Sequence, residues 1–281
     1  MIDTTSISQT LADSVKVEHA ESGSGWILHH VMDGNYLDFS PFFKIYLPQF
    51  QIFGFDISIT RHVVFMWLCA ILLTLVMLSV AKSYKKSTIP KGFNNFWEVF
   101  IVFVRDDIAK STIGKGYERF LPFLLTIFFF ILFGNFLGLI PFSATFTSNI
   151  AVTATLAILS FVVIQFGGMR KNGTFGYFRG LIPHGVPVLL LPIMIVVEFL
   201  GLFTKPFALA IRLFANMTAG HIVIYALISL IFVMQSVVWA GLAVPLALFI
   251  YMLEILVALL QAYIFTMLSS LFIGMAVHQD H

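Results

Sequence analysis

Four charged side chains lie in stretches of this chain that are otherwise apolar: Glu198, Lys205, Arg212 and Glu254. Insertion scales assign a cost of about 2.5–3.5 kcal/mol to an arginine, lysine or aspartate at the centre of a membrane helix. Because intramembrane charges usually mark ion paths, we assign Arg212 and Glu254 such a role. For Lys205 we favour a structural role, in which the charge pairs within the protein or snorkels to an interface. For Glu198 both interpretations stay open.

The spacing of these residues places several of them on one helix face. Glu198, Lys205 and Arg212 recur every seven residues, so they share a face of a helix with 3.6 residues per turn, provided that Pro206 does not break the phase. Asn216, four residues after Arg212, joins this face.

Other polar residues extend the pattern to a second helix. His221 lies nine residues after Arg212, about half a turn around the helix. Glu254 and Gln261 are seven residues apart and share a face of the last apolar segment. The sequence therefore predicts polar groups from two helices that line a common path.

The composition requires an integral membrane protein. Apolar residues make up 59% of the 281 residues and charged residues 11%, whereas a soluble domain has about a quarter charged residues. The net charge of +2 does not favour a nucleic-acid surface. The single cysteine, Cys69, excludes a disulfide framework and a cysteine-based metal site. We expect no cofactor and no metal.

The distribution of charge predicts two regions, residues 1–61 and 62–281. The first is a polar, acidic extension, and its first 25 residues have the pattern of neither a secretory signal nor a transit peptide. Residues 63–81 are long enough to span a bilayer, and Lys82, Lys85 and Lys86 follow directly. The positive-inside rule places these lysines in the cytoplasm and the extension outside.

The middle of the chain predicts two further spans, at residues 120–140 and 150–166, before a loop that carries Arg170, Lys171 and Arg179. This basic loop is again expected to be cytoplasmic. Residues 93–112 mix aromatic and charged side chains. They predict either an amphipathic helix on the membrane surface or a cytoplasmic helix packed on protein.

The last two apolar segments, residues 187–234 and 242–277, are longer than a membrane span needs. The second would be about 54 Å long as one helix, whereas the hydrocarbon core is about 30 Å thick. The first predicts either two spans that break near residues 204–206 or one long tilted helix. Periodicity alone leaves both possibilities open.

Three motifs resemble the a subunit of rotary F-type ATP synthases: "EFLGLFTKP" at residues 198–206, "LAIRLFANMTAGHI" at 209–222 and "LLQAYIF" at 259–265. The resemblance extends from residue 63 to the C-terminus. It implies an all-α membrane protein with five transmembrane helices and one surface helix. The last two membrane helices would be long and steeply tilted against a ring of c subunits.

The resemblance also implies a function. The chain would be the stator subunit with two proton half-channels, and Arg212 would face the ring carboxylate and so couple proton flow to ring rotation and ATP synthesis. ATP chemistry would lie on other subunits. The implied partners are the c-subunit ring, the b-subunit peripheral stalk, the remaining ATP synthase subunits and the lipid bilayer. The implied location is the bacterial cytoplasmic (inner) membrane, with the N-terminus outside and the C-terminus in the cytoplasm.

The same resemblance implies that His221, Glu254, Asn216, Gln261 and Glu198 line the proton path. Proteobacterial members carry a glutamate at the position of His221 and a histidine at that of Glu254, and this chain has the two types exchanged. We expect His221 and Glu254 to act as a titratable pair on the outer side, with an ordinary buried ion pair as the alternative. A proteobacterial aspartate is also missing where residues 147–149 read "TSN".

Other classes of function agree less well with the sequence. An ion-coupled secondary transporter, the main alternative, usually shows internal repeats, and we see none. An intramembrane hydrolase needs a nucleophile with a base or a metal, and neither Gly-x-Ser-x-Gly nor His-Glu-x-x-His occurs.

Overall fold

The computed structural model describes residues 34, 36–39, 43–48, 51–52, 55–56, 58–86, 92–140, 143, 145–180, 191–234 and 237–278. Most of the predicted extension 1–61 lies outside these described residues, as do residues 187–190 and the last three residues, 279–281. All structural statements below concern the described residues.

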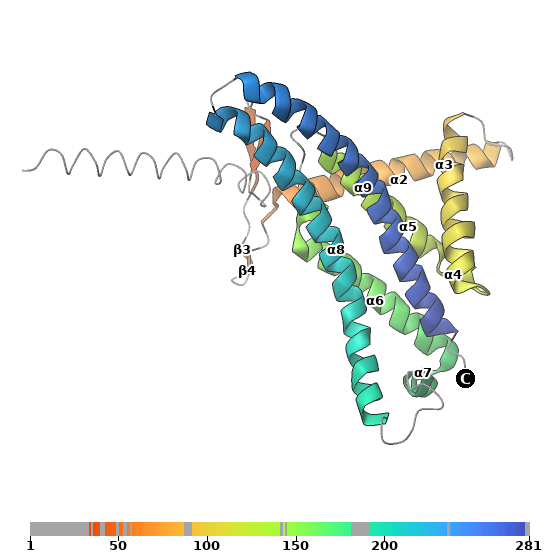
Figure 1. Ribbon diagram of the computed structural model, residues 1–281. Coiled ribbons are helices and arrows are strands. Elements are labelled where there is room, and N and C mark those ends of the chain that lie inside the picture. The colour runs from red at the N-terminus through yellow and green to blue at the C-terminus, as the bar shows by residue number, and fades with distance from the viewer. Residues whose placement is uncertain are drawn as a thin grey trace, which may run out of the picture. The chain divides into compact units, whose positions relative to one another are not determined.

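Five helices in the described part of the chain are long and apolar enough to cross a membrane (Figure 1). They are α2 (Arg61–Lys86), α5 (Leu121–Leu139), α6 (Ile150–Asn172), α8 (Leu191–Met234) and α9 (Val237–Val277). The predicted number of spans and the all-α class of the membrane region are confirmed.

The ends of the shorter spans follow from local chemistry. The Asn149 side chain accepts a hydrogen bond from the backbone N–H of Ala151 and so caps the start of α6. Gly173, with φ 72°, ends this helix, since a residue with a side chain is strained at such an angle. The helix extends six residues past the predicted end at Phe166, because Arg170 and Lys171 in its last turn are compatible with a helix C-terminus.

The two long segments are each one helix (Figure 1). At about 1.5 Å per residue, the 44 residues of α8 extend about 66 Å and the 41 residues of α9 about 62 Å. Pro206 and Pro245 lie inside these helices. This outcome decides between the two alternatives for residues 187–234 in favour of one helix. A proline costs one backbone hydrogen bond, whereas an unwound segment in lipid would leave several polar groups unsatisfied.

Residues 93–113 form a continuous helical segment made of α3 (Phe93–Val102), the π-helix η1 (Phe103–Lys110) and α4 (Ser111–Ile113). Trp97 is buried and stacks on Phe133 of α5, with 5.5 Å between the ring centroids. One face of this predicted amphipathic helix therefore packs on protein. A membrane-surface position for the other face stays a prediction.

The exposed face of that segment carries a bidentate ion pair. The Nε and Nη2 atoms of Arg105 lie 2.9 and 2.8 Å from the two carboxylate oxygens of Asp106. These hydrogen bonds, followed by the charge of Arg105, hold the pKa of Asp106 below its ordinary value. The pair is exposed, so solvent screens it and it contributes little stability.

Three short helices complete the membrane region: η2 (Tyr117–Arg119), η3 (Phe146–Ser148) and α7 (Thr174–Gly180). The described residues before α2 form two short antiparallel pairs, β1 (Tyr36–Phe39) with β2 (Phe43–Tyr46) and β3 (Gln51–Ile52) with β4 (Phe55–Asp56). These strands were not predicted.

The chain divides into two compact units. One contains Met1–His62 and Thr218–Ile255, and the other contains Val63–Met217 and Leu256–His281. The buried core of the second unit is apolar and is built largely from α5, with Leu124, Phe128 and Ile131, together with Phe265 and Ile273 of α9. Each unit positions part of the candidate site, and the parts are described in turn.

Candidate functional site

Arg212 lies on the outer surface of α8 in the second unit. Its side chain is exposed, and Phe207 and Ile211 beside it are also exposed, at 68% and 37%. Leu209 and Leu213, on one flank of Arg212 around the helix, are buried. Among the described residues, none forms a hydrogen bond or an ion pair with Arg212. A permanent cation on an apolar helix face requires a compensating group, so this geometry points to a partner beyond the described residues.

Asn216 and Gln261 are brought together from two different helices. The side-chain nitrogen of Asn216 donates a hydrogen bond to the side-chain oxygen of Gln261 across 2.9 Å. Asn216 is exposed, whereas Gln261 is only 1% exposed. The bond joins α8 to α9 one turn beyond Arg212, and it satisfies a buried amide oxygen that would be costly to leave without a partner.

His221 and Glu254 also meet, in the first unit. Nδ1 of His221 lies 3.5 Å from Oε1 of Glu254, and the two side chains are 15% and 3% exposed. Neither carboxylate oxygen has a hydrogen-bond partner among the described residues. The ring of Tyr225 stacks on His221 with the centroids 6.4 Å apart. The arrangement holds an imidazole and a carboxylate close enough to exchange a proton directly or through one water molecule.

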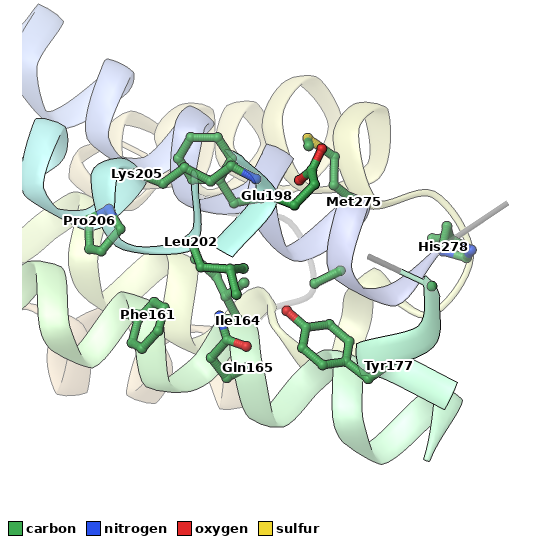
Figure 2. A pocket seen from close by; sticks show the side chains of 13 residues that line it. Phe161, Ile164, Gln165, Tyr177, Glu198, Leu202, Lys205, Pro206, Met275 and His278 are labelled. Carbon is green, nitrogen blue, oxygen red and sulfur yellow. The ribbon is translucent and has the colours of Figure 1, made fainter. Parts of the chain in front are cut away.

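Glu198 and Lys205 line one cavity of about 320 Å³ between α6, α7, α8 and α9 (Figure 2). The Nζ atom of Lys205 lies 5.3 Å from the ring centroid of Phe272, a cation–π contact. No ion pair joins Lys205 to Glu198 among the described residues. Glu198 and Lys205 therefore face the same cavity, as their seven-residue spacing predicted. Arg212, the third residue of that spacing, does not line the cavity.

Three polar residues of this cavity were missed in the sequence: Gln165 of α6, Tyr177 of α7 and His278 (Figure 2). The Nε2 atom of Gln165 is buried and has no hydrogen-bond partner among the described residues. An amide within a predicted span was the available signal. A cavity of this size that is lined by several polar side chains and contains a buried donor without a partner among the described residues has the features of a site that holds water.

His278 connects the end of α9 to Lys171 of α6 and to the backbone at Lys115. Its Nδ1 lies 3.0 Å from Nζ of Lys171, and its Nε2 lies 3.3 Å from the backbone oxygen of Lys115. Both contacts are satisfied together by a neutral imidazole that donates from Nε2 and accepts at Nδ1.

The loop with "TSN" contributes a buried contact. The hydroxyl of Thr147 donates to Oδ1 of Asn135 across 2.7 Å, and Nδ2 of Asn135 donates to the backbone oxygen of Ala258 across 3.3 Å. Both side chains are fully buried. Asn135 of α5 therefore links this loop to α9, and it is a further polar residue that the sequence analysis missed.

The described residues contain no cluster of three His, Cys, Asp or Glu side chains that could hold a metal ion. The described residues also include a carboxylate beside an imidazole, a cavity lined by a glutamate, and an exposed arginine.

The comparisons with known proteins point in one direction. The family model described as "ATP synthase A chain" matches residues 63–274. A relative named ATP synthase subunit a, from Chloroherpeton thalassium, is 58% identical over 258 residues, which cover 90% of this chain and 77% of the relative. The subunit a of Chlorobium phaeobacteroides is 51% identical, with 94% and 78% covered. That of an Anaeromyxobacter species is 44% identical, with 96% and 75% covered.

Proposed function

The chain belongs to the ATP synthase A chain family, and from this membership we propose that it is the proton-channel stator subunit of an F-type ATP synthase. The observation that carries the proposal is the position of Arg212, an exposed cation on an apolar helix face with no partner among the described residues. Its partner is the carboxylate of a c subunit, which passes this face as the ring turns.

The chemistry of the guanidinium suits this role. It does not lose its proton in proteins, so Arg212 cannot relay protons itself. A positive charge nearby stabilises the ionised form of a carboxylate and so favours release of the proton that the ring carries. The same charge opposes the direct passage of protons past the ring contact.

We assign the remaining polar residues to two half-channels. His221 and Glu254 form the titratable pair on the outer side, where they take protons from water and pass them inward. Asn216 and Gln261 hold α8 and α9 together beside the ring contact. The cavity that contains Glu198 is the cytoplasmic half-channel, since it lies at the ends of α6 and α9 next to the basic residue Lys171.

The proposed partners are the c-subunit ring, the b-subunit peripheral stalk and the other ATP synthase subunits. The protein is a multi-pass membrane protein. We place it in the bacterial cytoplasmic membrane, with the N-terminus outside and the C-terminus in the cytoplasm. The secondary-transporter alternative is not favoured, because the relatives are named as ATP synthase subunits.

Cross-linking to the ring tests this function directly. Cys69 is fully buried, so a new cysteine can be introduced without removing it. A cysteine at Ile211, which is 37% exposed, should form a disulfide with a cysteine placed beside the c-subunit carboxylate. Leu213→Cys is the matched control, since Leu213 is fully buried two residues away. Equal cross-linking at both positions, or at neither, would contradict the proposed ring contact.

A further inference from the structure

Gly220 of α8 lies directly against the carboxylate of Glu254. A Cβ atom at Gly220 would lie 2.5 Å from Oε1, 3.0 Å from Cδ and 3.3 Å from Cγ of that side chain. Real Cβ atoms do not approach other atoms as closely as the first of these distances. All three nearest atoms belong to Glu254, so the end of this side chain occupies the position that a Cβ at residue 220 would take.

Among the other glycines of the long helices, Gly274 of α9 lies against the backbone of Thr112, whereas two have no close neighbour. A Cβ at Gly201 of α8 or Gly241 of α9 would meet nothing within 4 Å. A glycine inside a helix is about 1 kcal/mol less favourable than alanine. At Gly220 the contact with Glu254 requires glycine, whereas Gly201 and Gly241 have room for a Cβ atom.

The contact determines where the carboxylate lies. Glu254 is 3% exposed, and its oxygens have no hydrogen-bond partner among the described residues that would hold them elsewhere. His221, the residue after Gly220, has its Nδ1 3.5 Å from Oε1 of Glu254. The bare backbone at position 220 therefore lets the carboxylate lie beside the imidazole.

We propose that Gly220 is a positioning residue for proton transfer between Glu254 and His221, an inference that rests on the proposed function of this pair. The size of residue 220 and the length of the acid at position 254 are coupled. Glycine at position 220 leaves room for glutamate at position 254. Alanine at position 220 leaves room only for aspartate, whose side chain is shorter by one methylene, about 1.5 Å. Because Glu254 is a flexible side chain, a Cβ at position 220 displaces the carboxylate instead of the helix backbone.

The test uses the complete ATP synthase in inverted membrane vesicles, with ATP-driven proton pumping as the readout. Gly220→Ala is expected to assemble and to pump about tenfold more slowly, since displacing a reacting group by about 1 Å costs up to a hundredfold. Gly201→Ala is the matched control, because it changes helix propensity in the same way without contacting any side chain. It should pump at the wild-type rate.

A compensating change separates positioning from a general packing role. Glu254→Asp alone should also pump slowly, because its carboxylate is withdrawn from His221. The double variant Gly220→Ala with Glu254→Asp should pump several-fold faster than either single variant. Its pH profile should return toward that of the wild type. A packing effect alone would change the amount of assembled complex and leave the pumping rate and the pH profile per assembled complex unchanged.

Each outcome decides the proposal. If Gly220→Ala pumps like Gly201→Ala, or if the double variant is no faster than the single variants, Gly220 does not position Glu254. If Gly220→Ala fails to assemble, the double variant should restore assembly. If neither variant assembles, the alanine clashes with a group other than Glu254, and the proposal is wrong. Arg212→Ala, assayed in parallel, distinguishes failure of the proposed function from failure of this inference. Normal pumping by Arg212→Ala refutes the proposed function. Loss of pumping by Arg212→Ala, together with normal pumping by the Gly220 variants, refutes only this inference.

Discussion

The side-chain amide of Asn216 on α8 donates a hydrogen bond to the side-chain oxygen of Gln261 on α9, 2.9 Å away. The acceptor is almost completely buried, and the donor follows Arg212 by four residues on the same helix. This hydrogen bond ties α8 to α9 one helical turn from Arg212, the residue proposed to contact the ring.

Asn216→Ala should therefore lower the stability of the complex, because the buried oxygen of Gln261 loses its partner at a cost of about 1–3 kcal/mol. Gln261→Ala should have a similar effect, and the double variant should lose less than the sum of the two. The measurement is the temperature at which detergent-solubilised complex dissociates. Thr204→Ala, which removes only a local bond to the Gly201 carbonyl, is the control. Strictly additive losses would show that the two amides do not interact.

Arg212→Ala and Arg212→Gln should assemble but abolish ATP synthesis driven by a proton gradient, since no fixed cation then compensates the ring carboxylate. Arg212→Lys should fail or nearly fail, because a lysine loses its proton more readily when desolvated and is a point charge instead of a planar fork. Arg170→Ala, at the exposed end of α6, serves as a control and should retain synthesis. Normal synthesis rates in Arg212→Ala membranes would refute the assigned role.

His221→Ala and Glu254→Ala should each reduce proton-driven synthesis, because each removes one half of a pair whose members lie 3.5 Å apart. The exchange of His221→Glu with Glu254→His should recover much of the rate, since it restores both groups at the same two places. Assembly is measured in parallel by the amount of complex in the membrane. Poor assembly with a full pumping rate per assembled complex would favour an ordinary buried ion pair.

Single cysteines at Ser24 and Gln279 should react with impermeant thiol reagents from opposite sides of the membrane. An odd number of spans places the two ends of a chain on different sides, and the described residues contain five candidate spans. The native Cys69 is fully buried and should stay unlabelled, which makes it an internal control. Labelling of both positions from the same side would contradict the assigned topology.

The sequence alone was sufficient for the class of protein and for the identity of its chemical groups. The long apolar segments predicted a membrane-spanning α-helical protein because lipid permits few other backbone structures, and the family resemblance set the number of spans at five. Arg212, His221 and Glu254 stood out because polar and charged side chains are costly in such segments. The seven-residue spacing also placed Glu198 and Lys205 on one face, and both line the same cavity.

Tertiary structure decided which of these groups meet. Residues 187–234 could form one helix or two, depending on whether the helix continues through Pro206. Periodicity does not show whether it does. The approach of His221 to Glu254 and of Asn216 to Gln261 depends on how two helices pack, which spacing along one helix cannot give. The proposed role of Gly220 could not be inferred from the sequence. It depends on which atoms lie beside the glycine in the folded chain, and these are atoms of Glu254.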